Sequence, residues 1–174
     1  MKKKFFTIIF IAFYIICFGQ TNEKIQREKF EYLEVGLSDF VVTNVDGKTK
    51  EEIYSKTLNW VKETYKNPDI VLKMKIENEK LRIEGVANNL LKLDKSSFNL
   101  DYVIEISFKD NKYRFELVSL LCGGTGDYKN APNFKTDKKM IKHFGSTAVD
   151  VENYFNKLNQ SLKDYIFGKT EEKW

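Results

Sequence analysis

Cys122 and His143 are the most reactive pair of side chains in the sequence, because they are the only cysteine and histidine beyond residue 19. A cysteine with a histidine base is the minimum set for thiol catalysis. Gly123, Gly124 and Gly126 follow the cysteine, and their amides could stabilise an oxyanion. The alternative is an idle thiol at a strand end and a surface histidine. We favour this alternative because no third residue that would orient the imidazole stands out.

Glu105 and Glu116 form a second candidate site. Alternating apolar and polar residues around a two-residue turn at 110–111 predict a hairpin in which these two glutamates face each other. A like-charge pair destabilises a sheet unless a cation lies nearby, and two carboxylates could hold a divalent ion through their oxygens. Arg82 and Arg114 are predicted on adjacent positions of the same face. We therefore expect a solvated, salt-linked face with no metal and no cofactor.

A lysine-rich and aromatic segment at 128–144 is the third candidate. Its aromatic and basic residues are Tyr128, Lys129, Phe134, Lys135, Lys138, Lys139, Lys142, His143 and Phe144. Long connections in compact domains often carry function, so this segment could dock an acidic partner, an envelope polysaccharide or lipid headgroups. Alternatively, it is an ordered flap whose aromatic rings cover a sheet edge. Thr136 is predicted to cap a short helix within it.

The elements that position these residues follow from hydrophobic periodicity. Alternation predicts strands with one buried and one wet face, and helical spacing predicts two helices with one apolar stripe each. The expected elements are strand 40–45, helix 50–66, strands 70–77, 81–88, 100–108 and 113–117 with a polar connection at 92–99, and helix 147–168. Thr49 and Glu52 form a capping box at the first helix. This pattern predicts a two-layer α+β domain, with an antiparallel sheet, helices on one face and the order β-α-β-β-β-β-α.

The predicted turns also fix which side chains face each other on the wet side of the sheet. The turn at 110–111 pairs Ser107 with Arg114, beside the two glutamates. A two-residue turn at 78–79 would place Lys73 opposite Glu84, with Lys75 opposite Arg82 in the same register.

The N-terminus has the layout of an export signal. Three lysines at 2–4 precede an uncharged apolar run at 5–18, and the small residues Cys17 and Gly19 allow cleavage after residue 19. The run is shorter than the roughly 20 residues that span a bilayer, which favours cleavage over a retained anchor. The bulky isoleucine before Cys17 argues against a lipid anchor there.

We therefore divide the chain into a signal peptide at 1–19, a lead-in at 20–37, one α+β domain at 38–168 and a tail at 169–174. Cleavage removes three lysines and no acid, so the formal net charge falls from +4 to +1. A near-neutral protein gives little reason to expect a nucleic acid partner. We expect no membrane span after cleavage. Cys122 is then the only cysteine, so it could link two copies through a disulfide.

Residues 40–60 read FVVTNVDGKTKEEIYSKTLNW. This run resembles the opening of the domain of unknown function 4468 family, which has a TBP-like fold and occurs in exported proteins of Bacteroidota. Residues 104–115, IEISFKDNKYRF, resemble the central hairpin of that family. The resemblance covers about residues 38–121, implies the same order of elements, and brings no activity and no catalytic residues. A TBP-type sheet binds DNA with basic residues and apolar wedges, whereas this face carries three glutamates, so we expect no DNA binding.

These observations favour an exported module of the cell envelope that binds a partner and performs no chemistry. The partner is an envelope protein, a glycan or a lipid, and the binding surface is either the wet sheet face or the loop at 122–146. Two alternatives stay open. One is an envelope enzyme that uses Cys122 or the pair of Glu105 and Glu116. The other is a subunit of a larger envelope assembly, with the final helix partly at an interface.

Overall fold

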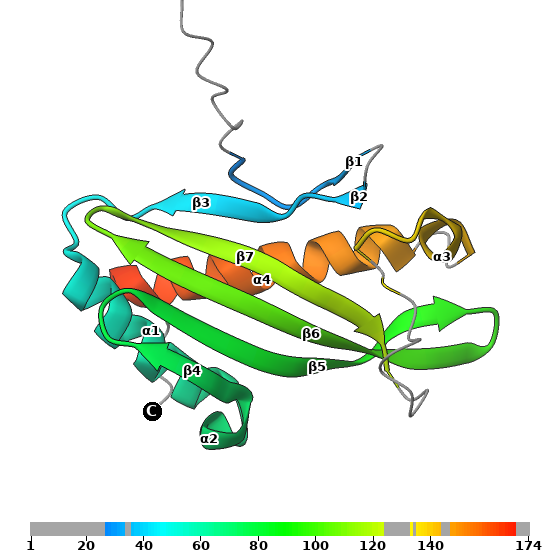
Figure 1. The fold of residues 1–174 in the computed structure, drawn as a ribbon, viewed down its shortest axis with the longest axis horizontal. Coiled ribbons are helices and arrows are strands. Elements are labelled where there is room, and N and C mark those ends of the chain that lie inside the picture. Colours follow the sequence, from blue (N-terminus) through cyan, green and yellow to red (C-terminus); the bar gives the residue numbers. More distant parts are fainter. Residues whose placement is uncertain (1–26, 34–35, 124–132, 134, 144–146, 170–174) are drawn as a thin grey trace, which may run out of the picture.

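The computed structural model describes residues 27–33, 36–123, 133, 135–143 and 147–169 (Figure 1). The predicted signal peptide, half of the predicted lead-in and most of the predicted tail lie outside these residues. Several residues of the predicted sites also lie outside them, namely Gly124, Gly126, Tyr128, Lys129, Phe134 and Phe144.

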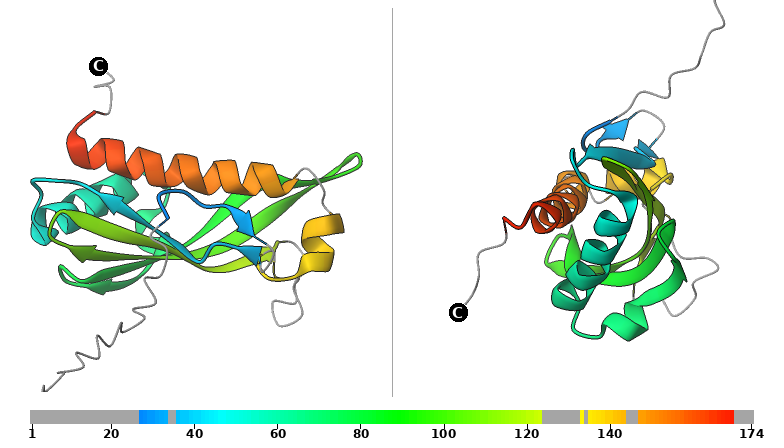
Figure 2. Two further views of the ribbon diagram at one scale, coloured as in Figure 1. Left: turned by 90° about the horizontal axis from the view of Figure 1, so that it is seen from above. Right: turned by 90° about the vertical axis from the view of Figure 1, so that its left-hand side faces the viewer.

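The described chain forms one five-stranded sheet with two long helices against it. In order, its elements are β1 (Tyr32–Leu33), β2 (Gly36–Leu37), β3 (Phe40–Asn44), α1 (Lys50–Thr64), α2 (Pro68–Val71), β4 (Leu72–Ile76), β5 (Lys80–Leu93), β6 (Ser96–Lys109), β7 (Lys112–Cys122), α3 (Lys138–His143) and α4 (Thr147–Phe167). The strand order in the sheet is β3-β7-β6-β5-β4, and every pair is antiparallel. Both α1 and α4 lie on the same face of this sheet (Figure 2). The predicted α+β architecture is confirmed, and β1, β2 and α2 are additions to it.

The first helix begins and ends where its sequence predicts. The Thr49 side chain accepts from the Glu52 amide, and the Glu52 carboxylate accepts from the Thr49 amide at 2.9 Å, which completes the capping box. The helix ends ahead of the Asn-Pro pair at 67–68. Trp60 is buried between the helices, and its indole nitrogen donates to Ser161 of α4 at 2.9 Å. This contact helps to hold the two helices together above the sheet.

The core lies between the helices and the inner face of the sheet. Its members from α4 are at helical spacing: Val151, Phe155, Leu162 and Ile166. They meet alternate residues of the central strands, such as Ile104, Ile106 and Phe115, all of which have no exposed surface. Phe30, from the segment before β1, packs edge-on against both Phe115 and Phe155. A residue of the predicted lead-in therefore belongs to the core.

The polar connection predicted at 92–99 is wrong, because β5 and β6 continue as a paired hairpin to a turn at 94–95. Leu91 is fully buried opposite Phe98. The Thr147 hydroxyl, at the start of α4, donates to the Lys92 carbonyl at 3.1 Å and accepts from its amide at 3.2 Å. The register shifts between Ala87 and Leu91, so simple alternation is lost there and the sequence hides the strand.

The register predicted for β4 is also wrong. The turn before β5 has three residues, 77–79, instead of two, so Met74 faces Arg82 and Ile76 faces Lys80. A register shift between Leu72 and Met74 then returns Leu72 to the inner face, opposite the buried Ile83. Lys73 does not face Glu84, and Lys75 does not face Arg82. Ile70, predicted in this strand, lies in α2 instead.

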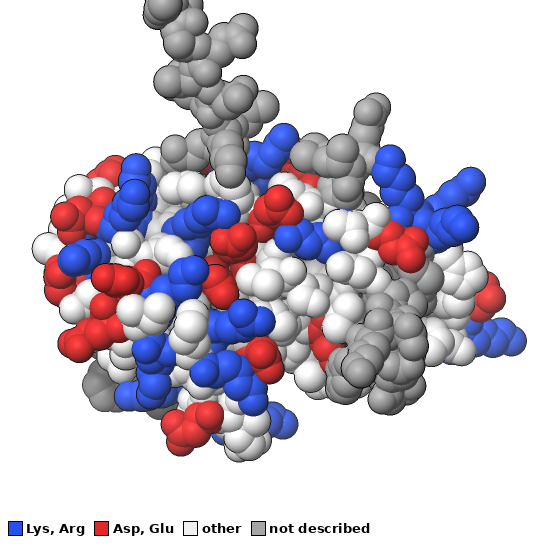
Figure 3. Space-filling model, viewed as in Figure 1, with Lys and Arg blue, Asp and Glu red and all other residues white. Residues whose placement is uncertain are grey.

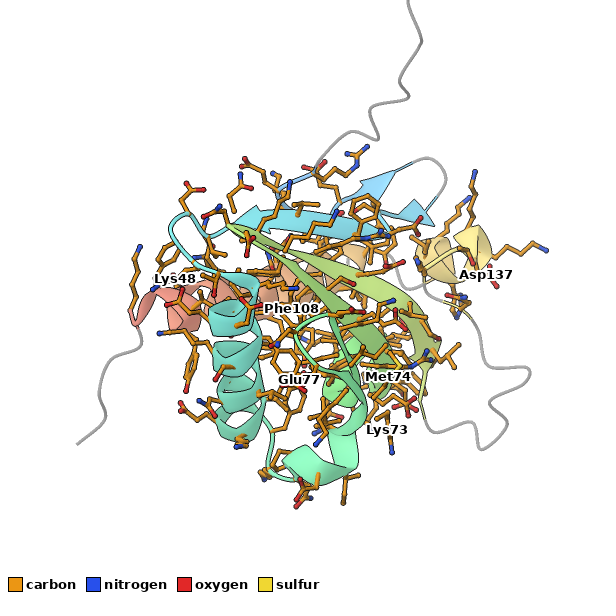
Figure 4. All side chains as sticks on the ribbon, turned by 60° about the vertical axis from the view of Figure 1, so that its left-hand side comes forward. Lys48, Lys73, Met74, Glu77, Phe108 and Asp137 are labelled. Atoms are coloured by element: carbon orange, nitrogen blue, oxygen red, sulfur yellow. The ribbon has the colours of Figure 1, made fainter. Side chains whose placement is uncertain are left out.

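This edge strand is short and irregular, and it carries two lysines. Lys73, Met74 and the turn residue Glu77 lie along this side of the domain (Figure 4). Lysines and a bulge on an exposed edge discourage pairing with a strand of another molecule. The β4 edge is therefore protected from sheet extension.

Candidate functional site

The helix layer leaves the opposite face of the sheet uncovered. We call it the open face, and it faces the viewer in Figures 1 and 3. Its rows run across the strands as Asn44, Lys112 and Lys109; then Val42, Arg114, Ser107, Lys80 and Ile76; then Phe40, Glu116, Glu105, Arg82 and Met74; then Ser119, Val103 and Glu84; and last Leu121, Asp101 and Val86. The face thus changes from basic to salt-linked to largely apolar along the strands.

The structure brings Glu105 and Glu116 directly opposite each other, and Ser107 opposite Arg114, as predicted. Glu105 accepts from Lys80 at 2.8 Å and from Arg82 at 3.2 Å, and only 15% of its side-chain surface is exposed. Glu116 pairs with the guanidinium of the same-strand arginine at 2.9 Å. Each carboxylate therefore has its own cation, which offsets the like-charge repulsion of the pair. Acidic and basic side chains alternate over this part of the face (Figure 3).

We call the residues Lys80, Arg82, Glu105, Arg114 and Glu116 the salt-linked band, because ion pairs join their side chains. Its carboxylates are already paired, and the described residues contain no group of three or more His, Cys, Asp or Glu side chains that could hold a metal ion. The two arginines and the two glutamates named from sequence thus lie together on one face.

A hollow of about 350 Å³ lies at the end of the open face nearest the turn at 110–111. Its lining residues are Phe40, Val42, Ser107, Phe108, Lys109, Lys112, Tyr113 and Arg114. Lys109 and Lys112 face each other, and the guanidinium carbon of Arg114 lies 3.9 Å from the centre of the Phe40 ring. We call this site the basic hollow. Sequence reasoning missed it, although two lysines placed symmetrically about a predicted two-residue turn were a usable signal.

A second hollow, of about 320 Å³, lies at the opposite end of the open face. Its lining includes the apolar residues Ile70, Val86, Val103 and Leu121 and the charged residues Lys73, Glu84 and Asp101. Val86 is 50% exposed and Ile70 is 64% exposed. We call this site the apolar hollow.

Tyr102 lies beneath the apolar hollow, on the inner side of the sheet. Its ring covers Gly85 on the neighbouring strand, so a β-carbon at Gly85 would collide with it. The Tyr102 hydroxyl is within 3.0 Å of the Tyr65 hydroxyl and 3.4 Å of the Tyr154 hydroxyl. Burial is the main cause that raises the pKa of Tyr102, and these two neighbouring phenols raise it further. Tyr102 therefore stays protonated, and the three hydroxyls form a structural cluster.

The environment of Cys122 opposes the thiol chemistry considered from sequence. Its side chain is 6% exposed, and burial, with a smaller contribution from Asp101, raises the thiol pKa. A catalytic cysteine needs the reverse shift. The Gly123 amide donates to the Asn99 carbonyl at 2.8 Å, so it is not available to an oxyanion. His143 is exposed at the end of α3.

The described part of the 128–144 segment covers the edge of β7 beyond the end of β3. Asn133 forms a bridge with Leu121. The Lys135 ammonium, 13% exposed, donates to the Leu117 carbonyl at 2.6 Å and pairs with Asp39 at 2.7 Å. These contacts favour the flap interpretation for the part near Lys135. The flap is held there by backbone and lysine hydrogen bonds, whereas the sequence led us to expect aromatic rings over the sheet edge. The aromatic residues expected to do the covering lie outside the described residues.

Beyond these contacts, the segment forms a short helix. Lys138 and Lys139 are exposed on α3. The carboxylate of Asp137 accepts from the Lys139 amide at 2.9 Å, so Asp137 caps this helix in place of the predicted Thr136. The two lysines, together with His143, stay candidates for contact with an acidic partner.

The comparisons with known proteins agree with this geometry. Residues 40–121 match a family described as a domain of unknown function (DUF4468) with TBP-like fold. The chain contains a DUF4468 domain. The match runs from the first residue of β3 to the penultimate residue of β7, so it covers α1 and all but the last residue of the five-stranded sheet. No curated protein matches the chain.

Two solved structures share the DUF4468 fold with this chain. A TBP-like protein from Parabacteroides distasonis ATCC 8503 is 15% identical with a TM-score of 0.57, covering 74% of this chain and 90% of that one. A DUF4468 family protein from Bacteroides ovatus ATCC 8483 is 13% identical with a TM-score of 0.53, covering 76% of this chain and 90% of that one. At these identities the likeness shows the fold alone.

Proposed function

We propose that this DUF4468 protein is an exported module of the cell envelope that binds a partner through its open face and carries out no chemistry. The observation that carries the proposal is the open face itself. The helices cover one face of the sheet and leave the other uncovered, and that uncovered face holds two hollows at its two ends. Ligand sites are usually concave and largely preformed, which fits this arrangement.

The salt-linked band supports the proposal because it joins the two hollows. Lys80 and Arg82 both contact Glu105, which is mostly buried among them. A network of this kind holds long side chains in fixed positions. The side chains of the band would therefore lose little conformational entropy when a partner binds across the open face, which lowers the cost of binding.

Export and the envelope location rest on the sequence of residues 1–19 and on the Bacteroidota relatives of the domain. Within the described residues, no helix is long and apolar enough to cross a membrane. The partner that we propose is an envelope protein, glycan or lipid. Nucleic acid is disfavoured because the centre of the face carries Glu84, Glu105 and Glu116.

An enzymatic role through Cys122 has less support, because burial raises the pKa of its thiol. A disulfide between two copies through the same residue would require the thiol to become accessible. A role as an assembly subunit is compatible with the open face, since a protein partner could cover it.

Two exposed valines allow a matched test of the open face. Val86 is 50% exposed in the apolar hollow, and Val149 is 56% exposed on α4. We expect Val86→Trp to reduce retention of the protein on envelope fractions of its host in a sedimentation assay. Val149→Trp should bind like the unmodified protein, since it adds the same bulk on another surface. Equal retention of all three proteins would show that the open face is not the binding surface.

A further inference from the structure

The basic hollow contains three cations, Lys109, Lys112 and Arg114, and the two lysines have no ion-pair partner among the described residues. Lys109 and Lys112 face each other directly across the hairpin, and both are exposed. Neither forms an ion pair with any residue that the structure describes. Like charges directly opposite each other destabilise a hairpin. Arg114 is diagonal to Lys109, so a third positive charge lies on the same side of the sheet.

The other polar groups of the basic hollow are hydrogen-bond donors as well. The Nε atom of Arg114 is buried and has no hydrogen-bond partner in the described chain. The Ser107 hydroxyl lies opposite Arg114 and can donate a hydrogen bond to a ligand. Glu116 is the carboxylate that pairs with this guanidinium, at 2.9 Å, and it belongs to the neighbouring row. Three cations and one carboxylate leave a net charge of +2 at the hollow.

The wall of the basic hollow is apolar on the side of β3. The Phe40 ring lies 3.9 Å from the guanidinium carbon of Arg114, and Val42 is directly opposite Arg114. A ring over the guanidinium removes water from one of its faces, and a less hydrated cation attracts an anion more strongly. The hollow thus offers a positive rim next to a small apolar surface.

From this geometry we infer that the basic hollow binds a dianionic oxyanion of the phosphate monoester type that is attached to an apolar group. Its two charges would balance the net +2, and bridging Lys109 and Lys112 would relieve their repulsion. A carboxylate would leave one of these charges unbalanced. Inorganic phosphate would leave the Phe40 and Val42 wall unused. This inference rests on the proposed binding role of the open face and names a ligand class for one end of it.

The test uses octyl phosphate as the probe, followed by the backbone amide NMR signals of the ¹⁵N-labelled protein. We expect saturable shifts at Lys109, Lys112, Arg114 and the facing part of β3. Octyl glucoside, which has the same chain and no charge, should cause no saturable shift. Lys109→Gln/Lys112→Gln should weaken octyl phosphate binding by about tenfold or more, since two cations within a few ångströms of the phosphate are lost. Lys62→Gln/Lys157→Gln, on the helix layer, is the matched control and should bind normally.

The outcomes separate this inference from the proposed function. Binding of octyl glucoside at the same site, or equal binding by the two double variants, would overturn the phosphate site. Shifts centred on Val86 and Val103 would overturn it too, while leaving the open face as a binding surface. Shifts confined to α1 and α4 would count against both proposals.

The source of the phosphate is tested in a separate arm. Phosphatidylcholine vesicles with and without phosphatidic acid report on a membrane headgroup. Co-sedimentation that needs phosphatidic acid and is lost in Lys109→Gln/Lys112→Gln would assign the site to a lipid. Octyl phosphate binding without vesicle binding would assign it to a soluble phosphorylated ligand.

Discussion

Gly85 and Tyr102 form a pair whose energetics can be worked out from the structure. Gly85 lies in the middle of β5, where glycine normally weakens a strand because it has no side chain to pack. Here the ring of Tyr102, directly opposite on β6, covers the glycine backbone. Glycine is thus required by the approach of the ring. Gly85→Ala should therefore displace Tyr102 and strain the hydroxyl contacts that it makes in the tyrosine cluster.

The expected loss of stability is the sum of opposing contributions. Overpacking a core position costs about 1–3 kcal/mol, and weakening the hydroxyl contacts at 3.0 and 3.4 Å costs about 1 kcal/mol more. Replacing glycine by alanine at a permissive backbone angle recovers about 0.4–1 kcal/mol through the unfolded state. We therefore expect Gly85→Ala to lower the free energy of unfolding by about 1–3.5 kcal/mol.

The sign should reverse when the ring is absent. The three atoms nearest to a β-carbon at Gly85 all belong to the outer part of the Tyr102 side chain, which leucine lacks. In a Tyr102→Leu background, Gly85→Ala should be neutral or stabilise by up to about 1 kcal/mol. Urea unfolding of the four proteins, followed by the fluorescence of the buried Trp60, measures this cycle. A neutral Gly85→Ala in the unmodified background would refute the reasoning.

Four further expectations concern other parts of the chain. Thr49→Ala should lower the free energy of unfolding by about 1 kcal/mol, because it removes one half of the capping box, and urea unfolding would measure it. Glu105→Gln should lower the free energy of unfolding by about 1 kcal/mol at low salt, because two cations lose their shared carboxylate. The loss should be smaller at high salt, and a loss that does not depend on salt would contradict an ionic origin. Burial raises the pKa of the Cys122 thiol, so iodoacetamide should label the folded protein near pH 8 much more slowly than the urea-unfolded protein, and equal rates would contradict the burial. Burial also raises the pKa of Tyr102, so the native state keeps a proton that the unfolded state loses above about pH 10; stability should fall as pH rises past that value, with tyrosinate absorbance appearing together with unfolding.

The β6–β7 hairpin could be predicted from sequence because two independent signals agree there. A two-residue turn and strict alternation give the same register, and every buried residue of one strand meets a buried residue of the other. The β4–β5 register could not be predicted in this way. Asn78 adopts a positive φ of 56° in a turn that is one residue longer than expected, and a bulge beyond it compensates for the shift. Two local irregularities of opposite effect leave no trace in the alternation of the sequence.

The site could be predicted only where charge pairing follows from register. The pair of Glu105 and Glu116 followed from the hairpin register, and so did the arginine diagonal to Glu105. The basic hollow did not, because Phe40 enters it from β3, which is distant in sequence and paired to β7 by tertiary contact. Sequence reasoning gave more weight to the lysines of the 128–144 segment, although Lys135 among them is engaged with the sheet edge.

The rigidity of the basic hollow comes from side chains that point away from the open face. Neighbouring residues of a strand point to opposite faces, so the side chains of Thr43 and Tyr113 point into the core. There, the Tyr113 hydroxyl lies 2.9 Å from the amide oxygen of Asn159, whose amide nitrogen donates to the Thr43 hydroxyl at 3.0 Å. All three side chains are at most 7% exposed, and leaving any of these groups unpaired would be costly in such a dry site. This network ties β3 and β7 to α4 directly beneath the row of Val42 and Arg114. The helix layer thereby fixes the spacing of the two strands that form the wall and the rim of the hollow.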